Sequence, residues 1–220
     1  VQGDRHEVRV EAPAGRVQRV QTRVDGGTLT ITNRSGHVEI PLFGSGAHTA
    51  SPRIVVTAPS IESIVVNGAV AFSAGRLDVP ALRIAASGAA KLRIDDLKAE
   101  SLRLSGAGAV QVDVAGRVTE QSISLSGAGD YRAPRLLSGT AKVSVAGAGR
   151  VVVHAEQSLR VNLSGAGNVE YLGNPEVKQS VSGIGRVKRR ETGAAPIGTG
   201  FRVAAVSARG SRRPAGPSPA

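Results

Sequence analysis

The sequence of 220 residues contains no cysteine, no methionine and no tryptophan, and it has only two tyrosines and three phenylalanines. Without cysteine there can be no disulfide and no thiolate metal site. With so few rings, a core must consist of Val, Leu, Ile and Ala, which suit stacked short strands. The sequence contains no run of about 18 apolar residues, so no membrane-spanning helix is predicted. Because translation starts with methionine, Val1 indicates a processed start, and we expect that a targeting segment has been removed.

The net charge of +11 is distributed unevenly. Residues 191–220 are rich in Ala, Gly, Pro and Arg without any periodicity, so we expect a disordered basic tail. In the body, basic residues such as Arg83 and Arg103 alternate with apolar ones, which is typical of a solvated sheet face. With so few rings to stack on bases, the body predicts no specific nucleic-acid partner.

A turn of small residues recurs along residues 61–190, with its first glycine every 18–21 residues. The first glycines are Gly68, Gly88, Gly106, Gly127, Gly147, Gly165 and Gly183, and the second ones are Gly108, Gly129, Gly149, Gly167 and Gly185. Around each turn apolar and polar residues alternate, as Leu102, Arg103 and Leu104 do, which predicts half-buried strands. A unit this short cannot bury its own apolar face. We therefore expect parallel stacking into an all-β solenoid related to the parallel β-helix.

The glycines have a structural reason in this fold. A chain that turns sharply at the same place in every rung needs positive φ or a close approach to the next rung, and glycine alone tolerates both. Serines just before the turns are expected to stack in one column and cap backbone groups; they are Ser105, Ser126, Ser164 and Ser182. Their recurrence favours a structural role over a catalytic serine.

Residues 1–60 lack the repeat and contain short alternating segments. The sequence Asp25-Gly26-Gly27 is a hairpin signal. We expect a β layer here that caps the first rung, because a bare solenoid end exposes both core and strand edges.

The repeated Leu-x-Leu-Ser-Gly-Ala-Gly-x-Val pattern, preceded by the segments 24–31 and 55–61, resembles the bacterial head GIN domain family. This is a family of putative auto-transporter adhesins, also described as a domain of unknown function, and the resemblance covers residues 5–190. It implies a right-handed β-helix-like fold, a secreted, periplasmic or outer-surface location and an adhesin-like role. It brings no catalytic residues. The turns at Gly68 and Gly88 depart from the motif because they lack the second glycine.

Cofactor and metal sites are not indicated. A strand rather than a helix follows each Gly-x-Gly, so no phosphate-binding loop is predicted. Calcium-binding repeats need Asp in the turn, whereas Arg150 and Arg186 follow two of these turns. The four histidines, His6, His37, His48 and His154, share no ligand spacing.

The sequence therefore predicts a non-enzymatic binding surface or scaffold for a protein or glycan ligand at the cell surface, with a homo-oligomer left open. The alternative is a carbohydrate-active β-helix enzyme, a lyase or hydrolase, with carboxylates from Asp95, Asp96 and Asp113. Basic neighbours such as Arg93 and Arg103 favour plain surface charges instead. An enzyme would show clustered carboxylates in a cleft, and a scaffold would show flat ladders of Ser, Thr, Arg and Asn.

Overall fold

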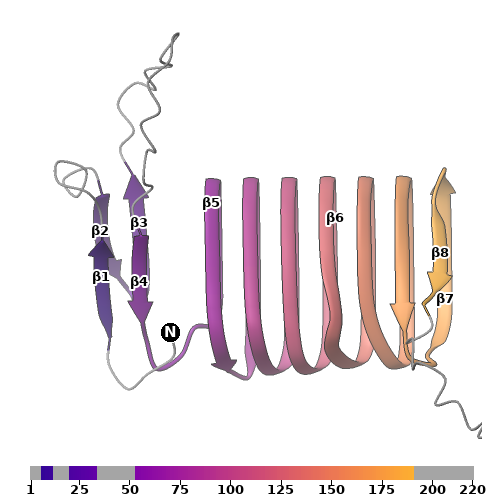
Figure 1. Ribbon diagram of the computed structural model, residues 1–220, viewed down its shortest axis with the longest axis horizontal. Helices are drawn as coiled ribbons and strands as arrows, with labels where there is room; N and C mark the ends of the chain where they lie inside the picture. The colour runs from indigo at the N-terminus through magenta and orange to yellow at the C-terminus, as the bar shows by residue number, and fades with distance from the viewer. Residues whose placement is uncertain (1–5, 12–19, 34–52, 191–220) are drawn as a thin grey trace, which may run out of the picture. The chain divides into compact units, whose positions relative to one another are not determined.

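The computed structural model describes residues 6–11, 20–33 and 53–190, which contain strands and no helix (Figure 1). The first four strands form two separate antiparallel pairs: β1 (Glu7–Glu11) with β4 (Arg53–Thr57), and β2 (Val20–Asp25) with β3 (Thr28–Asn33). The β2–β3 hairpin turns at Gly26 and Gly27, whose φ angles are 53° and 76°. Positive φ at both turn residues matches the right-handed twist of paired strands, so the predicted hairpin is confirmed.

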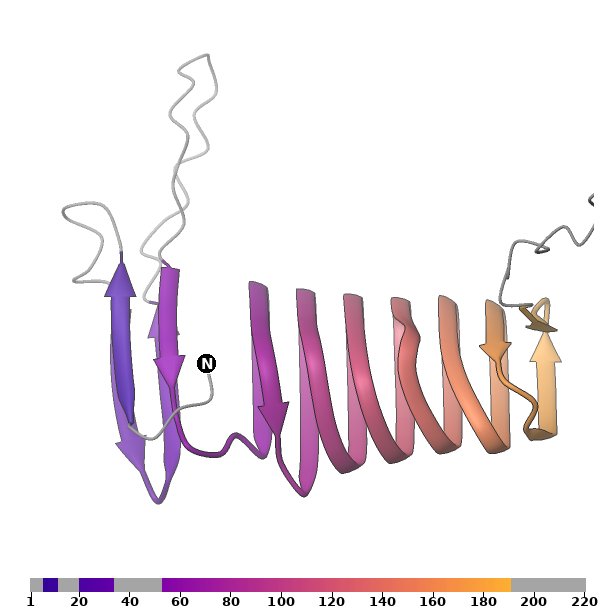
Figure 2. The same ribbon diagram turned by 60° about the horizontal axis from the view of Figure 1, so that its bottom comes forward.

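The remaining strands form the predicted solenoid of parallel coils. They are β5 (Ser63–Asp78), β6 (Ala81–Leu172), β7 (Glu176–Gly183) and β8 (Arg186–Arg189). β5 lies parallel to the first coil of β6, with Ser63 opposite Arg83, and the last coil of β6 pairs with β7 and β8. β6 therefore winds through successive coils, which stand side by side in Figures 1 and 2. A rung takes 20 residues at the first pair and 18 at the last, where Ser158 lies opposite Glu176.

The three sheets are not linked by strand pairing. Among the strands that the structure describes, none pairs with the outer edge of β5. The role of residues 1–60 as a cap therefore stays a prediction. The basic tail of residues 191–220 lies outside the described residues.

The core is the narrow interior of the coils, and the period-two pattern fills it. Leu102, Leu104, Val110 and Val112 are at most 1% exposed, whereas the intervening Arg103 is exposed. The predicted alternation is confirmed. Full burial of such a side chain contributes about 1.5–3 kcal/mol. Each rung depends on its neighbours for this burial, because a single coil leaves both open ends of its interior uncovered.

A column of glycines runs along the turn from rung to rung. Gly127 has a φ of 102°, and a Cβ atom added to it would lie 2.9 Å from the carbonyl oxygen of Gly108 in the preceding rung. A side chain there would meet both backbone strain and the neighbouring coil. We call the set the glycine column; its members, with φ from 92° to 128°, are Gly68, Gly88, Gly108, Gly127, Gly147, Gly165 and Gly183.

The third rung is registered differently from the sequence alignment, which put Gly106 at the turn. In the structure Gly108 stacks on Gly88, and Gly106 is buried without a positive φ. A Cβ atom on Gly106 would lie 2.8 Å from Cδ2 of Leu125. The register has shifted by two residues. Because such a shift keeps every side chain on the same face of its strand, the alternating pattern cannot reveal it.

Apart from Gly108, the second glycines of the motif lie off the glycine column. Gly129, Gly149, Gly167 and Gly185 have no positive φ, and a Cβ atom on Gly149 would lie 2.8 Å from the carbonyl oxygen of Gly129. They form a second column in which coils approach closely. The structure adds Gly116 and Gly173, with φ of 128° and 93°, which the repeat did not single out.

Candidate binding surface

Outward side chains form columns whose members are found by counting from the glycine column. Over most of the solenoid, a small polar residue occupies the position three residues before each glycine of this column. We call this the serine column, and its polar members are Ser105, Ser124, Ser144, Asn162 and Ser180. All five are exposed, so they present hydroxyl and amide groups in a row to solvent.

A second polar column lies one residue before each glycine. Its serines are Ser87, Ser126, Ser164 and Ser182. The Ser87 hydroxyl donates to Oδ1 of Asn67 at 2.6 Å, which links two rungs. The hydroxyl of Ser126 lies 3.4 Å from the carbonyl oxygen of Gly106. The expected column of serines is thus present, except that Ser105 belongs to the neighbouring serine column because of the shifted third rung.

An exposed ridge of alanines follows the glycine column. Its members are Ala69, Ala89, Ala109, Ala128, Ala148 and Ala166. Ile184 continues the ridge in the last rung and is 90% exposed. Small side chains keep this edge of the solenoid even.

The face after the turn carries a shallow, open groove. Its polar lining comes from successive rungs and includes Gln111, Asp130, Arg132, Arg150 and Asn168. Asp130 and Arg132 form an ion pair within it, and the hydrogen bond from the guanidinium to Asp130 raises the pKa of Arg132. These two charges of the groove therefore neutralise each other.

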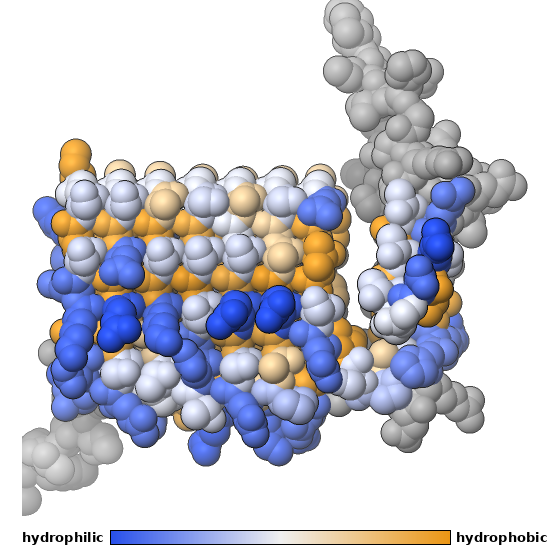
Figure 3. Space-filling view, turned by 180° about the vertical axis from the view of Figure 1, so that it is seen from behind, coloured by the Kyte–Doolittle hydropathy of each residue, from blue (hydrophilic) through white to orange (hydrophobic). Residues whose placement is uncertain are grey.

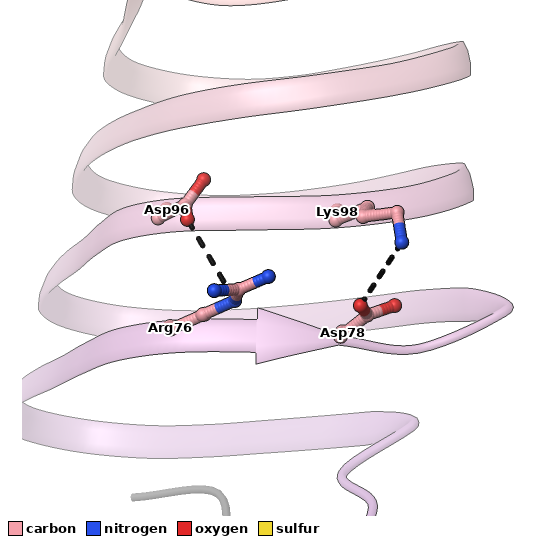
Figure 4. Close-up of polar contacts among 4 residues, drawn as sticks. All are labelled: Arg76, Asp78, Asp96 and Lys98. Carbon is pink, nitrogen blue, oxygen red and sulfur yellow. Dashed lines mark hydrogen bonds and ion pairs between the residues drawn. The ribbon is translucent and has the colours of Figure 1, made fainter.

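The carboxylates proposed for an enzyme do not converge. Asp95 pairs with Arg93 at 2.7 Å, and this hydrogen bond raises the pKa of Arg93. Asp96 pairs across the rungs with Arg76 at 3.9 Å, beside the parallel pair of Asp78 and Lys98 at 3.2 Å (Figure 4).

Asp113 lies in the same outward column as Arg93 and Arg132, one rung from each, and its charge contributes to raising the pKa of both guanidinium groups. Each of these three aspartates therefore interacts with at least one arginine. That arrangement does not supply the acid and base pair that glycoside cleavage needs.

Metal-binding clusters are absent from the part of the chain that the structure describes. His154 is half-buried, with its Nδ1 3.4 Å from the carbonyl oxygen of Pro134, whereas His6 is exposed. His37 and His48 lie outside the described residues. No helix that could cross a membrane occurs in the described ranges.

A buried polar cluster was not foreseen from the sequence. Gln121 occupies an inward position and receives a hydrogen bond from the Tyr131 hydroxyl at 3.0 Å. Its amide donates to Ser138 at 2.8 Å, and Ser138 donates to the carbonyl oxygen of His154 at 2.6 Å. Burial raises the pKa of Tyr131 far above its ordinary value. The one signal in the sequence is a glutamine at an apolar position of the alternation, but its partners come from later parts of β6.

Comparison with known families gives one match over most of the chain. The family described as "putative auto-transporter adhesin, head GIN domain" matches residues 1–175. No curated protein sequence matches.

Solved structures share the fold. A putative adhesin from Bacteroides fragilis is 22% identical, with 86% of this chain and 85% of that chain covered and a TM-score of 0.78. A putative lipid binding protein from Parabacteroides distasonis is 21% identical, with coverage of 86% and 87% and a TM-score of 0.68. A putative adhesin from Parabacteroides merdae is 17% identical, with coverage of 84% and 83% and a TM-score of 0.63. At these identities the likeness establishes the fold alone.

Proposed function

Because the chain belongs to the head GIN domain family of putative auto-transporter adhesins, we propose that its solenoid is a non-enzymatic binding surface of the bacterial envelope or exterior. The observation that carries this proposal is the serine column, which is polar in five successive rungs. Ser105, Ser124 and Ser144 repeat one kind of group at the same place in successive rungs. Neighbouring strands lie about 4.8 Å apart, so these groups form a regular array suited to an extended ligand.

The arrangement of charge supports binding over catalysis. Catalytic acids and bases depend on carboxylates placed close enough to shift each other's pKa. Here Asp95 and Asp96 are both exposed, and each pairs with an arginine. A ligand at the cell surface, either a glycan or a protein, is the partner class that an adhesin-like surface requires.

The test is a paired measurement of binding and turnover on the same samples. The purified full chain is applied to an immobilised panel of neutral glycans, acidic glycans and envelope proteins, and the release of reducing ends from the glycans is followed in parallel. We expect saturable binding to at least one member of the panel and no release of product. The variant Asp95→Asn with Asp96→Asn should bind as the parent does. Cleavage of a glycan that this variant abolishes would contradict the proposal and support the enzyme alternative.

A further inference from the structure

One outward column on the face before the turn is basic along most of its length. It lies five residues before each member of the glycine column, and two register pairs fix its ends: Ser63 opposite Arg83, and Arg160 opposite Lys178. We call it the basic ladder; in order it holds Ser63, Arg83, Arg103, Ser122, Lys142, Arg160 and Lys178. Figure 3 views this face, with a row of blue side chains running along the solenoid below rows of paler polar ones.

Charges in the basic ladder are arranged differently from the charge pairs that link the first two rungs. Between β5 and β6, Arg76 lies opposite Asp96 and Asp78 opposite Lys98, so neighbouring rungs carry opposite signs (Figure 4). In the basic ladder, Arg160 lies opposite Lys178. Like charges directly opposite each other on adjacent strands destabilise a sheet. The basic ladder therefore carries a repulsion that the charge pairs between β5 and the first coil of β6 avoid, which is typical of a site built for a ligand.

The arginines of the ladder remain available to a ligand. Lys142 pairs with Glu120 at 2.9 Å, and Lys178 pairs with Glu176 at 3.1 Å. Arg83, Arg103 and Arg160 are exposed, and none of them forms an ion pair with a carboxylate of the described residues. A guanidinium offers a planar fork of donors that matches a carboxylate or sulfate group in two parallel hydrogen bonds.

The serine column beside the ladder identifies the class of ligand further. The serine column lies two residues along each strand, about 6.6 Å away, and supplies hydroxyl and amide groups. Such groups bind sugar hydroxyls. Neither column contains an aromatic ring, on which the bases of a single-stranded nucleic acid would stack. Val65, in the first rung, is the single large apolar side chain of the two columns, so the face offers little to insert into a membrane.

We propose that the basic ladder and the serine column together bind a linear acidic polysaccharide that lies along the long axis of the solenoid. The array extends over five rung steps from Arg83 to Lys178, or about 24 Å. Anionic groups along the polymer pair with the arginines, and sugar hydroxyls bond to the serine column. The inference rests on the proposed binding function and names the partner class for one face.

The experiment measures the affinity of the full chain for oligomers of polygalacturonate, a linear carboxylated polysaccharide, against neutral dextran at several salt concentrations. The ladder variant carries Arg83→Gln, Arg103→Gln and Arg160→Gln. We expect it to lose affinity about 1000-fold, because hydrogen bonds to charged groups contribute roughly tenfold for each of the three arginines. The slope of log affinity against log salt concentration should become less steep by about two, since fewer counterions are released on binding.

A matched control removes the same charge elsewhere. Arg117, Arg135 and Arg189 are exposed, lie outside both the ladder and the groove, and form no ion pair within the described part of the chain. Their replacement by Gln should change affinity by less than about threefold, because net charge alone acts weakly at a distance in salt. A second variant with Ser105→Ala, Ser124→Ala and Ser144→Ala should weaken binding by about three- to tenfold at unchanged charge. The ladder variant should unfold at the same or a slightly higher temperature, since it loses repulsion and no partner.

Three outcomes would overturn the inference. The first is an equal loss in the control variant, which would indicate attraction to net charge alone. The second is loss of binding in a tail variant with Arg209→Gln, Arg212→Gln and Arg213→Gln, together with normal binding by the ladder variant. That result would place the contact in the tail. The third is preference for an oligonucleotide or for vesicles with anionic lipid over polygalacturonate. Binding to a neutral glycan or a protein with no affinity for polygalacturonate would refute this inference and leave the proposed function intact.

Discussion

The middle rungs and the last rung place similar residues in the same columns but bury them to different extents. Val145 and Val181 both lie two residues before a member of the glycine column, yet Val145 is 2% exposed and Val181 is 41% exposed. Val145 has rungs on both sides, whereas β7 pairs with β6 alone among the described strands. Burial in this fold therefore depends on the next rung more than on the residue itself.

The last rung also differs in composition. Gln179 occupies the inward column that holds Val143 and Val161 in earlier rungs. The two strands of the last rung also carry lysines, Lys178 in β7 and Lys188 in β8. Lysines on an edge strand discourage pairing with another chain. The end of the solenoid is thus adapted to being an edge, and four changes would test how far this difference extends.

The largest effect is expected from Gly127→Val in the glycine column. A β-branched residue meets strained φ and the carbonyl oxygen of Gly108, which costs on the order of 3 kcal/mol or more. The matching change Gly183→Val should cost less, because the last rung can fray without unpairing the others. Denaturant unfolding of both variants compares them. Ser124→Val, on the exposed phase of the same strand as Gly127, should stay within about 0.5 kcal/mol. If it proves the more damaging, the inward and outward faces have been exchanged.

The second comparison truncates one column at two places. Val145→Ala should lower the free energy of unfolding by about 2 kcal/mol, since it removes buried methyl groups and leaves a cavity. Val181→Ala should cost below about 0.5 kcal/mol because its side chain is already partly in water. Thermal melts can resolve this, as 1 kcal/mol corresponds to about 2–4 °C in a domain of this size. Equal costs would show that the end of the solenoid is covered.

The third prediction concerns the polar cluster, which exists in the middle rungs. Tyr131→Phe should cost about 1–2 kcal/mol at neutral pH, because Oε1 of buried Gln121 loses its donor. The raised pKa of Tyr131 means that the folded state holds this proton more tightly than the unfolded state does. Its contribution is therefore complete below about pH 10 and declines as pH rises further. Unfolding followed between neutral and alkaline pH should show a steeper loss in the parent than in Tyr131→Phe. Parallel curves would contradict the assigned burial.

The smallest effect is expected from removal of residues 191–220. The tail offers no periodic apolar residues to the core, so a chain that ends at Arg190 should keep its melting temperature within about 2 °C, which is below about 1 kcal/mol. A larger drop would mean that Phe201 or Val203 covers the last rung.

The sequence predicted much of this fold because its two signals are local. Alternation identifies strands, and the recurring glycines identify rungs. The registration of the third rung was missed because rungs of unequal length admit a two-residue shift that preserves alternation. The same limit hid the basic ladder: Arg83 and Arg103 are recognisable as outward residues, but only the register between rungs places them in one column with Arg160. The polar cluster around Gln121 was equally hidden because its partners come from distant positions in the chain.

The direction of the strands determines how the solenoid responds to force. Strands run across its long axis, so the hydrogen bonds between rungs run along it (Figure 1). Tension applied at Ser63 and Arg190 loads these inter-rung ladders in series, and the weakest one opens first. The last rung, with fewer buried side chains, is the expected point of failure. A solenoid anchored at one end and pulled at the other would yield one coil at a time and release about 18 residues of slack with each step.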